Sequence, residues 1–64
     1  MENLKKIKNQ SEVNIIGLLN SNSFNKDDIQ SIVEFDRKVA EDHNIFISDK
    51  ELNTIVNSLK KKFI

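Results

Sequence analysis

Residues 48–63 read Ser-Asp-Lys-Glu-Leu-Asn-Thr-Ile-Val-Asn-Ser-Leu-Lys-Lys-Lys-Phe. This stretch contains the features of a complete amphipathic helix: residues that favour its N-terminus, an apolar stripe, and residues that favour its C-terminus. Ser48 is a favourable N-cap, and Glu51 stands three residues later, as a reciprocal capping box requires. The acidic first turn and the lysines at 60–62 both complement the helix dipole. One apolar stripe at helical spacing contains Leu52, Ile55, Val56, Leu59 and Phe63. The sequence therefore predicts a helix over 49–62.

The preceding segment carries a similar pattern. Asn25 is a favourable N-cap, and the acidic residues Asp27 and Asp28 follow it in what would be the first turn. An apolar face at helical spacing is formed by Ile29, Ile32, Val33, Val39 and Ala40, with Phe35 at its margin. These features predict a second helix over about 26–42.

The N-terminal segment allows two interpretations. Four apolar residues, Leu4, Ile7, Ile15 and Leu18, share a stripe if one helix runs over about 3–20. Asn9 with Glu12 forms another capping-box pattern, so a helix could also restart near residue 10.

The segment between the second and third helices, residues 44–47, is too apolar for an ordinary exposed loop. Its alternation suggests an extended piece that turns either Ile45 and Ile47, or Phe46, toward the core. The predicted fold is all-α: a small three-helix bundle with a short extended apolar connector between helices 2 and 3, the last two helices leaning antiparallel. The predicted core consists of Ile15, Leu18, Ile29, Ile32, Val33, Ile55, Val56 and Leu59.

The length of 64 residues predicts a single helical domain over 1–64, close to the lower limit for a chain that folds alone. The chain has no cysteine, which excludes disulfides and thiolate metal sites. A core this small has to be supported by efficient packing, self-association or docking on a partner. No run is apolar enough to cross a bilayer, and no cleavable leader follows the basic N-terminus, so we expect a cytoplasmic protein.

Asp36 is the most informative single residue, because it falls in the centre of the apolar stripe of the second helix. A carboxylate there has to find a partner or reach water. One interpretation is a specificity contact, across a dimer or into a bound protein. The alternative is a structural carboxylate that pairs with a lysine or caps another helix.

His43 is the only histidine, and it lies two turns beyond Asp36 on the same side of the helix. That separation of about 10 Å is too long for an acid–histidine pair, and no nucleophile is placed beside either residue. We therefore expect His43 to serve as a C-terminal cap or as a charge at the helix end. We also expect that the protein is not an enzyme and needs no cofactor or metal.

The ten basic and ten acidic residues cancel, which argues against nucleic-acid binding by bulk charge. Lysines at 5, 6 and 8 and at 60–62 would form one basic patch if the chain ends met. The second and third helices loosely resemble a helix-turn-helix, but the acidic start of the third would face the phosphates. Nucleic acid is therefore an unlikely partner, although a DNA-binding dimer that pools lysines from both copies stays an alternative.

These observations predict a non-enzymatic protein-binding module that acts as a regulator, adaptor or inhibitor of another protein. The abundance of isoleucine, asparagine and lysine is typical of A/T-rich genomes and fits a protein encoded by a phage or plasmid. A homodimer and a structural or assembly subunit are the further alternatives. The predicted partner-binding residues are Asp36, His43, Phe46, Lys60, Lys61 and Lys62.

Overall fold

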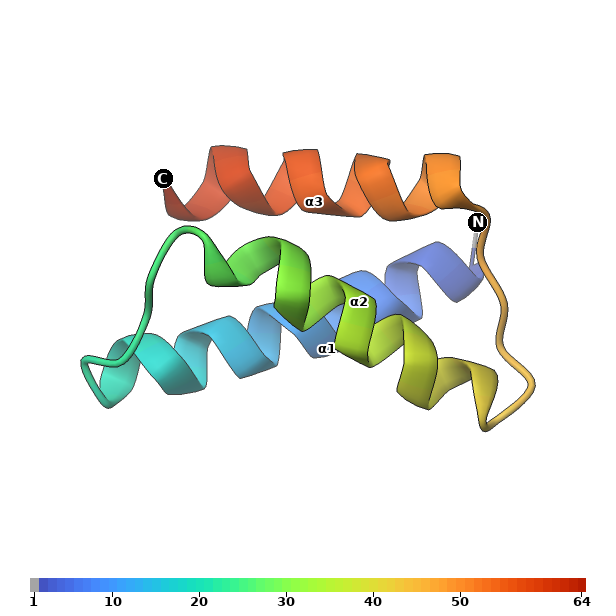
Figure 1. The fold of residues 1–64 in the computed structure, drawn as a ribbon, viewed down its shortest axis with the longest axis horizontal. Helices are drawn as coiled ribbons and strands as arrows, with labels where there is room; N and C mark the ends of the chain where they lie inside the picture. Colours follow the sequence, from blue (N-terminus) through green and yellow to red (C-terminus); the bar gives the residue numbers. More distant parts are fainter. Residues whose placement is uncertain (1) are drawn as a thin grey trace.

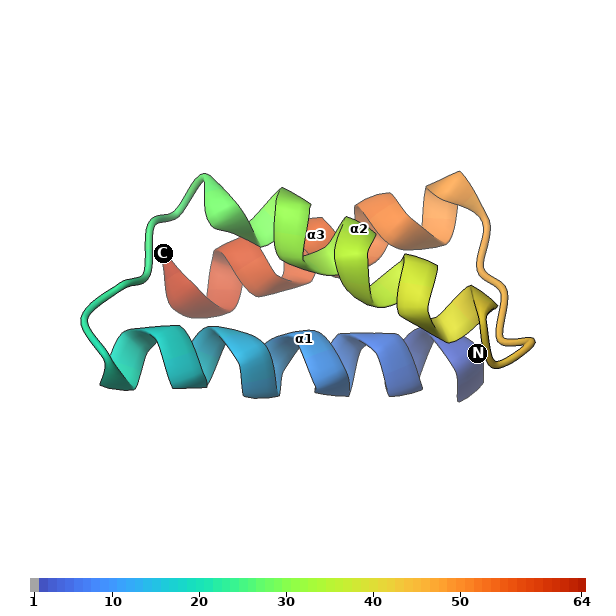
Figure 2. The same ribbon diagram turned by 60° about the horizontal axis from the view of Figure 1, so that its bottom comes forward.

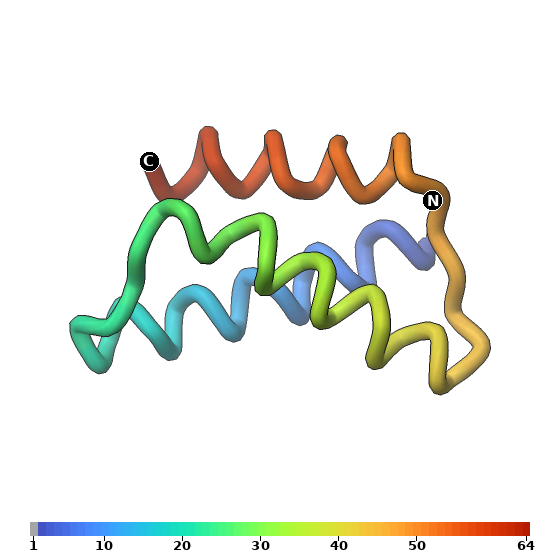
Figure 3. The backbone as a smooth tube through the Cα atoms, in the orientation of Figure 1, coloured from blue at the N-terminus to red at the C-terminus, as the bar shows by residue number. Residues whose placement is uncertain are grey.

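The computed structural model describes residues 2–64 and contains three helices, α1 (Glu2–Asn20), α2 (Asp28–Glu41) and α3 (Asp49–Phe63). The three helices pack against one another, and α2 runs in the opposite direction to α1 and α3 (Figure 1; Figure 3). No strand occurs within the described range. The predicted all-α three-helix fold is confirmed.

The first helix is continuous and does not restart near residue 10. Ile7, Ser11 and Ile15 recur every four residues along its buried face. Because this face packs on the other two helices across the Asn9–Glu12 pattern, tertiary packing keeps the helix intact where a local signal allowed a break.

The second helix begins at Asp28, two residues later than predicted, and Asn25 is not its N-cap. The Asn25 side-chain oxygen accepts a hydrogen bond from the N–H of Asp27 at 3.0 Å, and its carbonyl accepts one from the N–H of Asp28 at 2.8 Å. Asn25 therefore closes a turn ahead of the helix, a role for which asparagine is equally suited.

An asparagine also lies in the turn that follows α1 and in the turn that follows α2. Asn22 and Asn44 adopt the left-handed conformation, with φ of 57° and 62°. Beyond α2, the N–H of Ile45 donates to the carbonyl of Ala40 at 2.9 Å and the N–H of Asn44 donates to that of Glu41 at 3.0 Å, the two bonds of a Schellman motif. In a chain whose one glycine is elsewhere, asparagine supplies the residue that tolerates this conformation.

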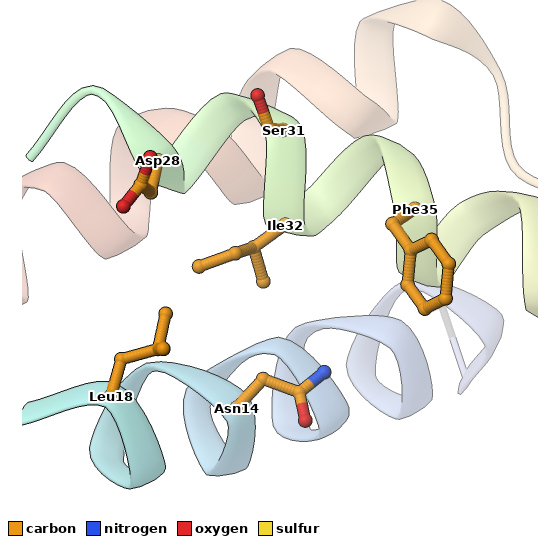
Figure 4. Close-up of a pocket in the computed structure, with 6 residues that line it drawn as sticks. All are labelled: Asn14, Leu18, Asp28, Ser31, Ile32 and Phe35. Carbon is orange, nitrogen blue, oxygen red and sulfur yellow. The ribbon is translucent and has the colours of Figure 1, made fainter. Parts of the chain in front are cut away.

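Each helix contributes one fully buried isoleucine to the core: Ile15, Ile29 and Ile55. The other buried apolar side chains are Ile7, Val33, Ile47, Leu52, Val56 and Leu59. Leu18 and Ile32, which the sequence placed in the core, are only half-buried. Both line a groove between α1 and α2 instead (Figure 4).

The apolar connector points Ile47 into the core, keeps Ile45 half-buried and turns Phe46 outward with 59% of its surface exposed. The Arg37 guanidinium holds this segment against α2, since it donates to the Ile47 carbonyl at 3.2 Å and to the Asp49 carboxylate at 2.8 Å.

The predicted capping box of α3 is present. The Ser48 hydroxyl accepts from the N–H of Glu51 at 3.1 Å, and the Glu51 carboxylate accepts from the N–H of Ser48 at 3.0 Å. The bond donated by the Ser48 backbone lowers the pKa of Glu51 below its ordinary value of 4.5.

A lowered native pKa adds stability above the unfolded-state pKa, and this stability is lost as the pH falls through the native pKa. We therefore expect Glu51→Gln to be less stable than the natural protein at neutral pH, with a difference that shrinks as the pH falls below 4.5. Urea titrations of both proteins across the acid range measure this difference. A constant difference at every pH would contradict the assignment.

Candidate functional site

Asp36 is buried, with 5% of its surface exposed, and it is held entirely from within the chain. The fully buried Ser11 hydroxyl donates to one carboxylate oxygen at 2.7 Å. The Asn14 side-chain amide donates to both oxygens, at 2.9 and 3.1 Å. This network joins α1 to α2. The sequence suggested that the carboxylate would pair with a lysine or cap another helix, whereas its donors are the hydroxyl of Ser11 and the amide of Asn14.

The other predicted partner-binding residues do not converge. His43 and Phe46 are exposed at the connector end of the bundle, whereas the lysines at 60–62 lie at the far end of α3 (Figure 1). Lys62 is engaged within the chain, because it pairs with the Glu12 carboxylate at 3.2 Å and lies 5.8 Å from the centre of the Phe63 ring. These residues therefore form no single site.

The two lysine clusters also lie apart. Lysines 5, 6 and 8 belong to the first half of α1, at the end of the bundle opposite the C-terminus (Figure 1). One copy of the chain consequently presents no joint basic patch to a phosphate backbone.

An open groove of about 450 Å³ lies between α1 and α2 (Figure 4). It is lined by Asn14, Leu18, Asp28, Ser31, Ile32 and Phe35. In the close-up, Leu18 of α1 points toward Ile32 of α2, and Phe35 projects from the next turn of α2, on the side of Asn14. Phe35 is 65% exposed, and Asp28 is the only charged residue of the lining.

A smaller hollow of about 160 Å³ continues along the same two helices toward the connector. Asp36 lines this second hollow and accepts a hydrogen bond from Asn14, which lines the first. Val39, with 41% of its surface exposed, also lines the second hollow. From here on, the α1–α2 groove means both hollows: the larger one of about 450 Å³ and the smaller one of about 160 Å³. Phe35 and Val39 stand one helical turn apart on α2 and form its exposed apolar ridge.

The helical spacing placed Phe35 at the margin of the apolar face of α2 and Val39 on that face. Helical periodicity shows which residues share a face, but it does not show how far a neighbouring helix covers that face. The exposed ridge could not be recognised without the position of α1.

Charge is distributed unevenly over the bundle. α1 and α3 together carry a net charge of +3, and α2 with the flanking segments 21–27 and 42–48 carries −3. The charged residues that α2 contributes to the groove lining, Asp28 and Asp36, are both acidic.

Within residues 2–64, no three histidine or acidic side chains come close enough together to hold a metal ion. None of the described helices has the length and apolar character that crossing a membrane requires. No protein-family model matches the chain, and no curated protein or solved structure is significantly similar to it.

Proposed function

We propose that the protein is a non-enzymatic interaction module that regulates, links or inhibits another protein through the α1–α2 groove. The observation that carries this proposal is the exposed Phe35 beside two half-buried aliphatic side chains, Leu18 and Ile32. An exposed aromatic ring next to an apolar hollow offers a large contact area at little cost in side-chain entropy, which is typical of binding hot spots.

The partner chemistry follows from the lining of the groove. Its apolar wall favours aliphatic side chains on the partner, in the manner of an amphipathic helix that lies in a groove. Asp28 is the only charged residue that lines the larger hollow, and both charged residues that α2 contributes to the groove, Asp28 and Asp36, are acidic. We therefore expect the bound segment to place a lysine or arginine near Asp28, because complementary charges fix the orientation of a complex.

Replacing Phe35 with alanine should weaken partner binding about tenfold or more, the effect of losing a hot-spot residue. Tagged protein would first capture the partner from the source cell, and titration of the purified partner would then measure the affinity of each variant. Helix content by circular dichroism should stay unchanged, since the side chain is mostly exposed.

Phe46→Ala is the matched control, because it removes the same ring from a site that is 59% exposed and outside the groove. It should leave the affinity unchanged. If Phe46→Ala abolishes binding and Phe35→Ala does not, the partner docks at Phe46, one of the residues that the sequence predicted, and not in the groove. Capture of nucleic acid alone would favour the DNA-binding alternative.

A further inference from the structure

The outer face of α1 holds a second apolar surface that neither α2 nor α3 covers. Figure 2 shows α1 along one edge of the bundle, with α2 and α3 both on the other side of it. Val13 and Ile16 are 62% and 46% exposed on this outer face. Asn9 and Asn20 are exposed one turn before and one turn after them. We call Asn9, Val13, Ile16 and Asn20 the α1 seam.

The seam has the spacing of a helix–helix contact. Steps of four, three and four residues keep its members on one stripe, as in the a and d positions of a coiled coil. Read from either end, the order is the same: amide, aliphatic, aliphatic, amide. A surface with this symmetry is complementary to its own copy when the two helices run antiparallel.

Charge on the same stretch favours a second copy. Glu12 is the only charged residue between positions 9 and 20, and Lys62 of the same chain pairs with it at 3.2 Å. In a two-fold interface each copy contributes the same patch, so an unpaired charge near the axis would lie close to the identical charge of the other copy and be repelled by it. The seam avoids this repulsion.

Gly17 provides a separate observation beside the seam. It lies inside α1 with ordinary negative φ, and apart from its chain neighbours and the adjacent backbone of α1 no atom lies within 4 Å of the position that a Cβ would take. Glycine is unfavourable in a helix interior, and packing within the chain does not require it here. Its lack of a side chain allows another helix backbone to approach closely.

We propose that a second copy of this chain covers the α1 seam, with the two α1 helices antiparallel about a two-fold axis. Val13 of one copy then lies opposite Ile16 of the other, and Asn9 lies opposite Asn20. None of the seam residues lines the α1–α2 groove, so the dimer and the docking of another protein are independent proposals.

Sedimentation equilibrium over a wide concentration range tests the association. The natural protein should show a reversible monomer–dimer equilibrium. Ile16→Lys should remain monomeric, because it places a charged side chain against the apolar seam of the other copy. Asn57→Lys adds the same charge at an exposed position of α3 and should still form dimers. Circular dichroism should show equal helix content for all three. A natural protein that stays monomeric throughout, or an Ile16→Lys dimer, would overturn the proposal.

Cysteine cross-linking tests the orientation, and the chain has no cysteine of its own to interfere. A mixture of Asn9→Cys and Asn20→Cys should form a disulfide-linked heterodimer under mild oxidation. Each variant alone should not, because antiparallel pairing separates like positions by about 16 Å along the axis. Efficient cross-linking of Asn9→Cys with itself would show a parallel pair and contradict the arrangement.

Discussion

Replacing Ile55 with alanine is expected to remove most of the free energy of unfolding of the protein. The side chain is fully buried in α3 and belongs to the trio of isoleucines at the centre of the core. Truncating a buried isoleucine to alanine costs about 2–5 kcal/mol, from lost transfer free energy and the cavity that remains. A core of this size rarely supplies more than about 3–5 kcal/mol of net stability. Circular dichroism at the helix band, followed through a urea titration, measures the loss.

Ile64→Ala is the matched control, because it removes the same atoms from a side chain that is 67% exposed at the end of the chain. Its unfolding free energy should stay within about 0.5 kcal/mol of the natural value. If Ile55→Ala keeps the same urea midpoint as Ile64→Ala, the burial of Ile55 contributes little, and the described core is wrong.

The predicted elements that the structure confirms are those with several independent signals. α3 combines a reciprocal capping box, dipole-compatible charges and an unbroken apolar stripe, and its observed range differs from the predicted one by a single residue. Asn25 had only its own cap preference and two acidic neighbours, which also suit a turn. The Asn9–Glu12 pattern was overridden because the apolar stripe of α1 continues across it.

The binding surfaces were less accessible to sequence reasoning. Periodicity identified Leu18 and Ile32 as apolar positions, but it could not show that α1 and α2 diverge enough to leave both at a groove. It also drew attention to Asp36, a polar residue on an apolar stripe, and passed over Val13 and Ile16, which lie on the far side of α1. Only the packing arrangement distinguishes an apolar side chain that the other helices cover from one that they leave exposed.

Asp36 provides the last prediction, because the structure supplies the donors that the sequence could not name. Asp36→Leu removes the acceptor of the fully buried Ser11 hydroxyl and of the Asn14 amide. A buried donor left without an acceptor costs about 1–3 kcal/mol. We expect Asp36→Leu to lower the unfolding free energy by about that amount, although leucine suits the apolar stripe.

A second substitution separates the lost hydrogen bond from any effect of shape. In the double variant Asp36→Leu with Ser11→Ala, no buried hydroxyl remains unpaired, and apolar groups replace both partners, a change that can be nearly neutral. We therefore expect the double variant to recover most of the stability that Asp36→Leu loses, as a non-additive double-mutant cycle. Asp42→Leu, at the exposed acid that follows α2 as its C-cap, should change stability by less than about 0.5 kcal/mol. Strictly additive losses at positions 11 and 36 would show that the two side chains are not coupled and would contradict this account of Asp36.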